Sequence, residues 1–440
     1  MLKTRYLLAL TLILMSVACT NTKKSEKADS NKDMETAKYY SDEMFLFVGT
    51  YTSEGGSEGI YLYRMNIESG VVDSVRMIEA NNPSYLVISK DEKHLYAVSE
   101  SGENSTVSAF SFDNSTGAMS HINTQSTDGA DPCYIEIDKL GNNVLTANYS
   151  GGSISMFSVR DDGGVSSVNS VINFEGSGQD ESRQASPHLH SVRFSPDGRF
   201  LFATDLGTDK IYRFKSLESV FEGQPLVIQS DITEIDVPAG MGPRHFDFHP
   251  SNKYMYLLGE LSGEVVVYDY NDGELSEKQT IVSDSLGARG AADIHVSPDG
   301  NFVYASNRLK GDGISIFSIN KDDGMLTKVG YQDTGLHPRN FVITPNGSFL
   351  LVACRDDNKI QIFSIDKTTG LLSDTGKDIR LSKPVCLKFA SAQEYTKSVE
   401  NNSQRFFVTN KIKINFFYLD GCCSFLFCEW HQVFLIFLYQ

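Results

Sequence analysis

Imidazole, guanidinium and carboxylate side chains recur in this sequence at places where turns normally carry glycine, asparagine or serine. His188 and His190 flank one leucine, Arg244 precedes His245, and Glu260 follows a glycine. Arginine presents a planar fork that binds a carboxylate or a phosphate through two hydrogen bonds. A histidine or a glutamate beside a bound water can act as a general base. These residue types therefore predict an anion-binding site with hydrolytic chemistry.

The elements that would position these side chains form a repeat. The turn Ser-Pro-Asp-Gly at 195–198 and 297–300 has four degenerate copies, and the second residue of each copy falls at 90, 139, 196, 250, 298 and 345. Each copy is followed by a short segment rich in β-forming residues and then by a segment in which apolar and polar residues alternate. In most copies a glycine turn and a weaker alternating segment come next. Period-two alternation predicts strands with one buried face. Four antiparallel strands per repeat predict a blade of a β-propeller.

The two ends of the repeat region complement each other. Residues 45–52 and 59–65 match the second and third strands of a blade, and residues 384–389 match a first strand. We expect these ends to form one blade, which closes the ring and removes free sheet edges. The fold class predicted is all-β, a seven-bladed β-propeller of four-stranded antiparallel blades over residues 43–391. A length of 440 residues would also allow two or three domains, but the repeat favours one.

The chemically active side chains occupy equivalent positions in this repeat, and in a ring of blades those positions open on one face, around a central funnel. The second strands end at Tyr51, Glu100, Tyr149, Leu206, Glu260, Arg308 and Arg355. The first strands begin at His188, His190, Arg244, His245, Asp293, His295, Arg339 and Asn340. An alternative interpretation is that these charges only pair with one another in a polar channel or are solvated.

Composition excludes several classes of function. The chain has 39 basic and 56 acidic residues, a net charge of −17, which argues against a nucleic-acid partner. Its seven cysteines lack the spacing of a disulfide framework, a zinc ribbon or a haem attachment site. Glycine doublets at 151–152 and 163–164 have no following helix that would bind a phosphate. We therefore expect neither a metal nor another cofactor.

The N-terminal segment predicts export. Residues 1–19 have a positive start and an apolar run at 6–18 that is too short to span a membrane, as in a signal peptide. The small residues before Cys19 resemble a bacterial lipobox, so we expect lipidation at Cys19 and a place in the periplasm or cell envelope. Cleavage by the ordinary peptidase, with Cys19 incidental, is the alternative. The polar composition of residues 20–42 predicts a disordered tether. A lipid anchor at Cys19 would then be the protein's contact with the membrane.

The C-terminal segment departs from the repeat. Residues 392–440 are rich in aromatic residues, contain three of the seven cysteines, and have neither strand alternation nor a helical period. We expect this atypical tail to lie outside the propeller fold. The alternative is an extension that binds a partner or associates with a membrane.

Several motifs resemble those of a known family. They are PHLHSVRFSPDGRF at 187–200, GPRH at 242–245, GEL at 259–261, YASNR at 304–308 and HPRN at 337–340. These motifs resemble the bacterial 6-phosphogluconolactonase family of seven-bladed propellers, which is related to the carboxy-cis,cis-muconate cyclases. The resemblance covers residues 43–390, nearly all of the repeat region.

The resemblance implies hydrolysis of 6-phospho-D-glucono-1,5-lactone to 6-phosphogluconate in the pentose phosphate pathway, without a metal. The motifs imply catalytic roles for His190, Arg244, Glu260 and Arg308, and substrate contacts for His188, His245, Asn307, Arg339 and Arg355. In this hypothesis Arg244 and Arg308 hold the anionic group and polarise the lactone carbonyl. Glu260 or His190 activates the water.

The export signal leaves other functions open, because the phospholactone is a cytosolic metabolite. The expected ligand is a small anionic lactone or sugar acid. An exported propeller could act instead on another sugar or organic-acid lactone, act as a cycloisomerase, or bind a ligand without catalysis. The sequence leaves the oligomeric state open.

Overall fold

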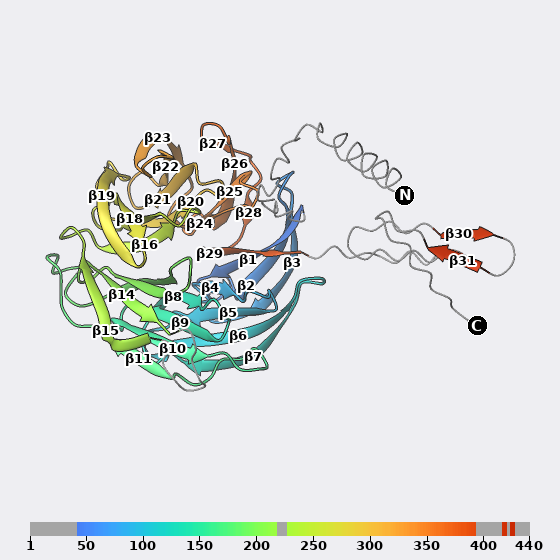
Figure 1. Cartoon of the computed structure of the whole chain (residues 1–440), viewed down its shortest axis with the longest axis horizontal. Helices are drawn as coiled ribbons and strands as arrows, with labels where there is room; N and C mark the ends of the chain where they lie inside the picture. Colours follow the sequence, from blue (N-terminus) through green and yellow to red (C-terminus); the bar gives the residue numbers. More distant parts are fainter. Residues whose placement is uncertain (1–41, 218–226, 393–415, 420–422, 427–440) are drawn as a thin grey trace, which may run out of the picture. The chain divides into compact units, whose positions relative to one another are not determined.

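The computed structural model describes residues 42–217, 227–392, 416–419 and 423–426. The chain divides into two units, Met1–Ala392 and Gln393–Gln440. The described part of the first unit forms seven antiparallel sheets arranged as blades around a centre (Figure 1). The described part of the second is one hairpin, of β30 (Phe416–Leu419) and β31 (Cys423–Leu426).

Each blade runs from an inner first strand to an outer fourth strand. The first strands are β29 (Pro384–Ser391), β4 (Leu86–Ile88), β8 (Pro132–Ile137), β12 (Leu189–Phe194), β16 (Pro243–Phe248), β20 (Ala291–Val296) and β24 (Pro338–Ile343). The second strands are β1 (Glu43–Thr50), β5 (His94–Ser99), β9 (Asn143–Asn148), β13 (Phe200–Asp205), β17 (Tyr254–Gly259), β21 (Phe302–Asn307) and β25 (Phe349–Cys354).

The outer half of each blade follows the same order. The third strands are β2 (Gly59–Asn66), β6 (Thr106–Asp113), β10 (Ser153–Ser158), β14 (Lys210–Ser216), β18 (Glu264–Asn271), β22 (Gly313–Ile319) and β26 (Lys359–Ile365). The fourth strands are β3 (Val72–Glu79), β7 (Ala118–Ser126), β11 (Ser170–Asn173), β15 (Val227–Asp236), β19 (Glu274–Val282), β23 (Leu326–Asp333) and β27 (Leu372–Asp374). A further strand, β28 (Ile379–Arg380), also pairs with β26.

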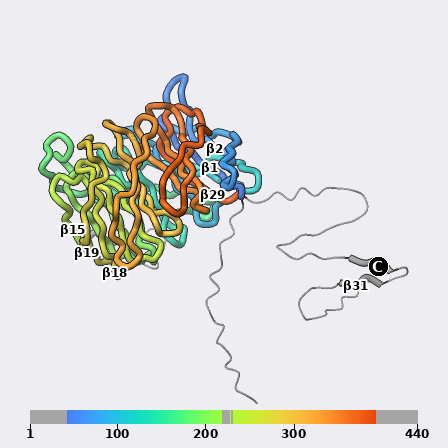
Figure 2. Tube along the Cα trace, turned by 90° about the horizontal axis from the view of Figure 1, so that it is seen from above, coloured from blue at the N-terminus to red at the C-terminus, as the bar shows by residue number. Residues whose placement is uncertain are grey.

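One blade joins the two ends of the ring. Strand β29 pairs antiparallel with β1, from Met44 opposite Ser391 to Thr50 opposite Pro384. Figure 2 shows β29 beside β1 and β2, although they lie at opposite ends of the repeat region. The prediction of a seven-bladed propeller with one composite blade is confirmed.

The Ser-Pro-Asp-Gly turns connect the first strand of a blade to the second. In the turn after β12, the hydroxyl of Ser195 donates to Asp197 Oδ1 (2.6 Å) and accepts from the backbone N–H of Phe200 (3.0 Å). Gly198 has φ of 78°, a left-handed conformation that glycine adopts without steric cost. Because the turn is short and hydrogen-bonded, it fixes the register of the two strands that carry the site.

A glycine–aromatic contact links neighbouring blades. The turn glycine between the third and fourth strands lies against the ring that begins the second strand of the preceding blade. A Cβ on Gly324 would lie 2.6 Å from Tyr254, and one on Gly370 would lie 2.4 Å from Phe302. The described turns repeat the contact in the pairs Gly70–Phe349, Gly117–Phe45, Gly163–His94 and Gly273–Phe200. The glycines of the sequence repeat are therefore sites of blade packing as well as turns.

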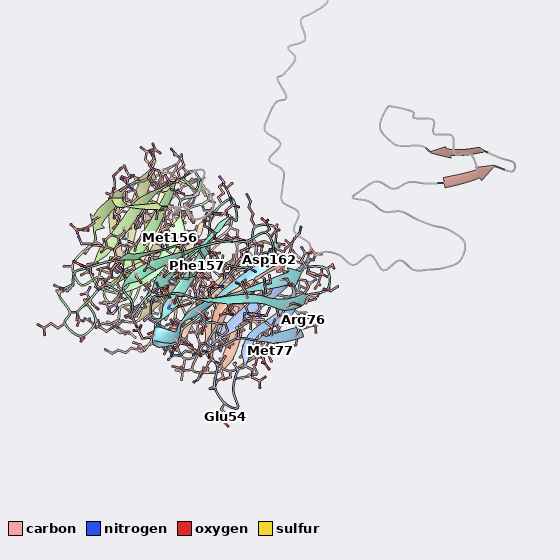
Figure 3. All side chains as sticks on the ribbon, turned by 90° about the horizontal axis from the view of Figure 1, so that it is seen from below. Glu54, Arg76, Met77, Met156, Phe157 and Asp162 are labelled. Carbon is pink, nitrogen blue, oxygen red and sulfur yellow. The ribbon has the colours of Figure 1, made fainter. Side chains whose placement is uncertain are left out.

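Apolar side chains fill the spaces within and between the blades. The second and third strands are almost wholly buried, whereas the fourth strands have exposed and half-buried side chains in turn. Met156 and Phe157 are buried in their blade, whereas Figure 3 shows Glu54 at the tip of a loop. Among the described residues, no helix is long and apolar enough to cross a membrane.

Candidate active site

Glu260 lies at the centre of a cluster of arginines on the face where the first strands begin. It follows β17, and its side chain is only 8% exposed. Arg183 Nη2 donates to its Oε1 (2.7 Å), and Arg244 Nε donates to its Oε2 (2.8 Å). Arg308 Nη2 lies 3.3 Å from Oε2. One carboxylate therefore binds three guanidinium groups, and the cluster carries an excess of positive charge.

The arginines set the ionisation of Glu260. Burial raises the pKa of this carboxyl, but Arg308, Arg244 and Arg183 outweigh burial and hold the pKa at about 2. Glu260 is therefore charged at neutral pH and is a weak proton acceptor. Its geometry suits an electrostatic role better than that of a general base.

Arg244 and Arg308 are fixed mainly by contacts inside the protein. Arg244 is 1% exposed and also donates from Nη1 to the carbonyl of Ala292. Arg308 Nε donates to the Gly290 carbonyl (2.7 Å), and its Nη1 lies 3.2 Å from Nε2 of His337. Burial lowers the pKa of Arg308 to about 9, partly offset by Glu260. Most N–H groups of both arginines are thus engaged before any substrate arrives.

Arg183 is a candidate site residue that the sequence analysis missed. It lies in the irregular connection between β11 and β12, where no repeat aligns, and its side chain is 33% exposed. Besides Glu260, its Nη2 contacts Tyr149 Oη at 3.4 Å. The 57-residue spacing between turns at this point, the longest in the chain, was the available signal of an inserted functional loop.

The two histidines of the HLH motif differ in environment. His190 is 4% exposed, with Nε2 3.8 Å from Glu260 Oε2 and Nδ1 3.5 Å from Cys133 Sγ. Burial lowers the pKa of His190 well below 6.5, and Arg244 lowers it further, so the ring is neutral at pH 7. His188 donates from Nδ1 to the carbonyl of Tyr149 (2.9 Å) and stacks on that ring at 4.4 Å. This bond leaves Nε2 of His188 as an acceptor.

His245 belongs to a network around Asp293. Its Nδ1 donates to Asp293 Oδ1 (2.8 Å), and its Nε2 lies 3.4 Å from Arg244 Nη1. Asp293 Oδ2 accepts from Asn340 Nδ2 (2.5 Å) and lies 3.0 Å from His295 Nε2. Burial lowers the pKa of His245 to about 3, and Arg244 adds to the effect. Asp293 thus ties three first strands, β16, β20 and β24, and orients His245 beside Arg244.

Arg339 is more exposed than Arg244 and Arg308. Its side chain is 15% exposed, its guanidinium carbon lies 5.6 Å from the ring centre of Tyr51, and its Nη2 is 4.0 Å from Glu100 Oε2. Tyr51 donates to Glu100 Oε2 (2.8 Å). The distance to Glu100 is too long for a hydrogen bond, so Arg339 keeps N–H groups for a ligand.

Two other predicted contacts are less available. Arg355 donates from Nε to Asp356 Oδ1 (2.7 Å) and contacts His337 Nδ1 (3.3 Å). Asn307 is fully buried, and its amide bonds with Ser283 and Ser315 inside the blade (both 3.2 Å). Their roles in substrate binding stay predictions, and the geometry gives Asn307 a place in blade packing.

The structure brings His190, Arg244, Glu260 and Arg308 together as predicted from the motifs, and adds Arg183. Their catalytic roles stay predictions. Among the described residues, no group of three or more histidine, cysteine or acidic side chains is arranged to hold a metal. Cys19 lies outside the described residues.

A closed seven-bladed ring with a buried imidazole and a guanidinium cluster at its mouth is typical of a propeller enzyme that acts on a small anionic molecule. Comparison with known proteins gives the family. Residues 45–389 match the family model described as "Lactonase, 7-bladed beta-propeller". The chain belongs to this lactonase family.

The chain is similar to relatives that it matches over almost their whole length. One is a 6-phosphogluconolactonase of Formosa agariphila, 39% identical over 341 residues, which cover 76% of this chain and 96% of the relative. Another is the 6-phosphogluconolactonase of Bacillus subtilis, 35% identical over 351 residues, covering 78% and 97%.

Solved structures agree with these relatives. A candidate 6-phosphogluconolactonase of Bacteroides fragilis is 50% identical, with a TM-score of 0.77 over 80% of this chain and 98% of that one. A periplasmic gluconolactonase of Pseudomonas aeruginosa is 31% identical, with a TM-score of 0.74 over 80% of this chain and all of that one.

Proposed function

We propose that this protein hydrolyses the lactone of an anionic sugar acid, and that its substrate is 6-phospho-D-glucono-1,5-lactone, which yields 6-phosphogluconate. The observation that carries the proposal is the guanidinium cluster around Glu260, an anion-attracting site in a chain of net charge −17. The names of the relatives from Formosa agariphila and Bacillus subtilis support this substrate.

The geometry suggests how water is activated. His190 is neutral at pH 7, and its Nε2 faces Glu260 at 3.8 Å, so it can accept a proton from a water in the funnel. Glu260 then stabilises the imidazolium that forms. The hydroxide adds to the lactone carbonyl, the bond from that carbon to the ring oxygen breaks, and the ring oxygen receives the proton from His190.

In this proposal Arg183 and Arg339 contact the substrate directly. Arg183 shares Glu260 with His190, so its remaining N–H groups can polarise the carbonyl that the water attacks. Arg339 lies by Tyr51 and has N–H groups for the phosphate. His188 offers Nε2 as an acceptor to a sugar hydroxyl. Arg244 and Arg308 hold Glu260 in place.

Substrate choice is tested by proton release in a pH-stat, with 6-phosphogluconolactone and glucono-1,5-lactone side by side. We expect the phosphorylated lactone to be preferred by at least about tenfold in kcat/KM, as one charge-assisted contact would give. Arg339→Met should remove that preference and leave turnover of the unphosphorylated lactone unchanged. Equal kcat/KM for both lactones in the wild type would rule out the phosphate contact.

A second candidate is an exported lactonase that acts on an unphosphorylated sugar lactone. Residues 1–19 favour it, and so does the likeness to a protein named as a periplasmic gluconolactonase. In this case the unphosphorylated lactone is preferred in the same assay. We propose that the protein is exported and lipidated at Cys19. A clickable fatty acid should label the wild type and not Cys19→Ser; equal labelling would exclude this anchor.

A further inference from the structure

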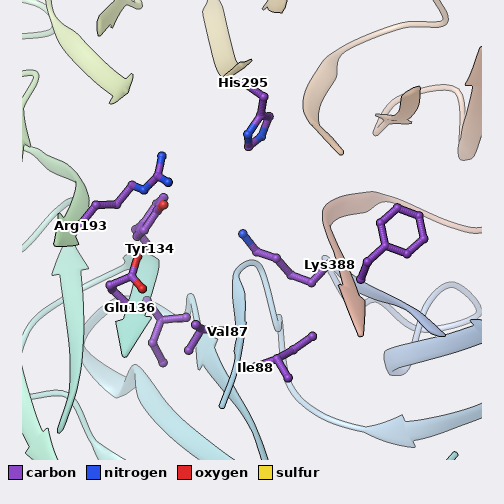
Figure 4. A pocket seen from close by; sticks show the side chains of 9 residues that line it. Val87, Ile88, Tyr134, Glu136, Arg193, His295 and Lys388 are labelled. Atoms are coloured by element: carbon purple, nitrogen blue, oxygen red, sulfur yellow. The ribbon is translucent and has the colours of Figure 1, made fainter. Parts of the chain in front are cut away.

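Away from the active site, a pocket lies toward the other end of the first strands, near the Ser-Pro-Asp-Gly turns. Its cavity of about 260 Å³ is lined by middle and late residues of β4, β8, β12, β20 and β29, whereas the active-site residues come from the beginnings of first strands, the ends of second strands and the connection that holds Arg183. His295, which the sequence predicted at the funnel, lines this pocket instead. Figure 4 shows Arg193, His295 and Lys388 reaching from three blades toward the same space. The pocket shares none of the residues that contact Glu260.

Lys388 is the most available cation of this pocket. Its Nζ lies 3.5 Å from Tyr85 Oη and 4.6 Å from the centre of that ring. It forms an ion pair with none of the carboxylates in the described part of the chain. An ammonium group that lines a cavity without a bound carboxylate is a ready donor for an anion.

Arg193 and His295 have carboxylate partners, but each keeps polar atoms for the pocket. Arg193 bonds to Asp247 Oδ1 (3.0 Å) and the Phe246 carbonyl through one nitrogen, Nη1. His295 bonds through Nε2 to Asp293 (3.0 Å), while its Nδ1 is 3.8 Å from Asp247, too far for a hydrogen bond. Arg193 therefore retains guanidinium N–H groups at Nε and Nη2, and His295 leaves Nδ1 as an acceptor.

Glu136 adds an acceptor to the same pocket, beside Tyr134 and the apolar wall of Val87 and Ile88. Burial raises the pKa of Glu136, and the nearby Arg193 and Lys388 only partly offset it. The pocket thus combines two cations, a carboxyl group and an apolar side, a combination that suits a small ligand with both oxyanion and hydroxyl groups.

We propose that this pocket is a second ligand site, separate from the active site, that binds a small hydroxylated oxyanion. The oxyanion accepts from Lys388 and Arg193, and a hydroxyl of the ligand donates to Glu136. Phosphate and short hydroxycarboxylates share this chemistry. The proposal goes beyond lactone hydrolysis and stands whichever lactone the active site prefers.

Calorimetric titration of the full chain with inorganic phosphate and, separately, with D-glycerate tests the site. Lys388→Met should weaken binding by at least about tenfold, because it removes a charge-assisted hydrogen bond, whereas Lys388→Arg should retain it. Lys90→Met, at an exposed turn, should bind both probes as the wild type does, and Arg339→Met, at the active site, should retain the binding that Lys388→Met removes. The probe that binds identifies the oxyanion class.

Three outcomes would overturn the proposal. They are absence of binding heat with both probes, wild-type affinity in Lys388→Met, and loss of affinity in Arg339→Met with none in Lys388→Met, which would place the ligand in the active site. Melting curves show whether Lys388→Met is folded; if it is not, Lys388→Gln replaces it, with the same expected loss.

Discussion

Glu260 determines the electrostatics of the active site, and its charge is coupled to stability. Its pKa in the folded protein, about 2, lies below the ordinary 4.5, so its stabilising contribution is complete above pH 4.5 and is lost as pH falls through 2. A shift of this size corresponds to on the order of 3 kcal/mol of folding free energy. The same charge that organises the arginines therefore helps to close this face of the ring.

We predict that Glu260→Gln lowers Tm at pH 7 and abolishes lactone turnover, because three guanidinium groups lose their shared counterion. The difference in Tm between wild type and variant should shrink as pH is lowered from 5 toward 2, in thermal melts across that range. Glu103→Gln, at an exposed position, is the control and should leave both unchanged. A Tm difference that stays constant with pH would contradict the assigned pKa.

The sequence allowed most of this site to be predicted at the level of single residues, because the repeat aligns the ends of equivalent strands. His190, Arg244, Glu260 and Arg308 occupy such ends and meet in the structure. Arg183 escaped prediction because it lies in a connection outside the repeat. The hydrogen-bond partners of Arg244 and Arg308 also could not be predicted, since backbone carbonyls such as those of Ala292 and Gly290 leave no signal in the sequence.

Strands and turns were the most predictable elements, since alternation and the Ser-Pro-Asp-Gly turn are local signals. The glycine–aromatic contact between blades could not be predicted, because it joins residues that lie about one blade apart in the sequence. It explains why a glycine recurs before the fourth strand: the space for a side chain is taken by the neighbouring ring. Blade packing therefore depends on residues that the sequence presents as turn formers.

Gly324→Ala tests this contact against Gly347→Ala. Both glycines have positive φ, 74° and 68°, but only Gly324 has a ring in the way, whereas nothing lies within 4 Å of a Cβ on Gly347. We predict a loss of about 1 kcal/mol for Gly347→Ala and a further loss of about 1–3 kcal/mol for Gly324→Ala, measured by urea unfolding. Equal losses would show that backbone conformation alone keeps glycine at these positions.

The whole ring depends on the composite blade. Strand β29 covers the inner edge of β1 over seven residue pairs, and without it that edge would be open to other chains. Repeat counting predicted this closure because each end of the repeat region lacked the strands that the other supplied. Repeat counting made no prediction about the structure of residues 392–440, since they carry no copy of the repeat.

Two truncations test the closure. A chain that stops after residue 392 keeps β29, and we predict the Tm and lactone turnover of the full protein. A chain that stops after residue 383 loses β29, and we predict aggregation and no cooperative melt. Calorimetry and size-exclusion chromatography measure both. If the shorter chain remained a monomer with an unchanged melt, closure by β29 would not be what holds the ring.

The most direct test of the central claim is the initial rate of 6-phosphogluconolactone hydrolysis by the wild type and His190→Gln, each corrected for the spontaneous reaction. General-base catalysis by His190 predicts a loss of about 10²–10⁴-fold in kcat with the Tm retained. His188→Gln should instead raise KM, since we assign it to substrate binding. Wild-type kcat in His190→Gln, or a wild-type rate no faster than buffer, would contradict the account.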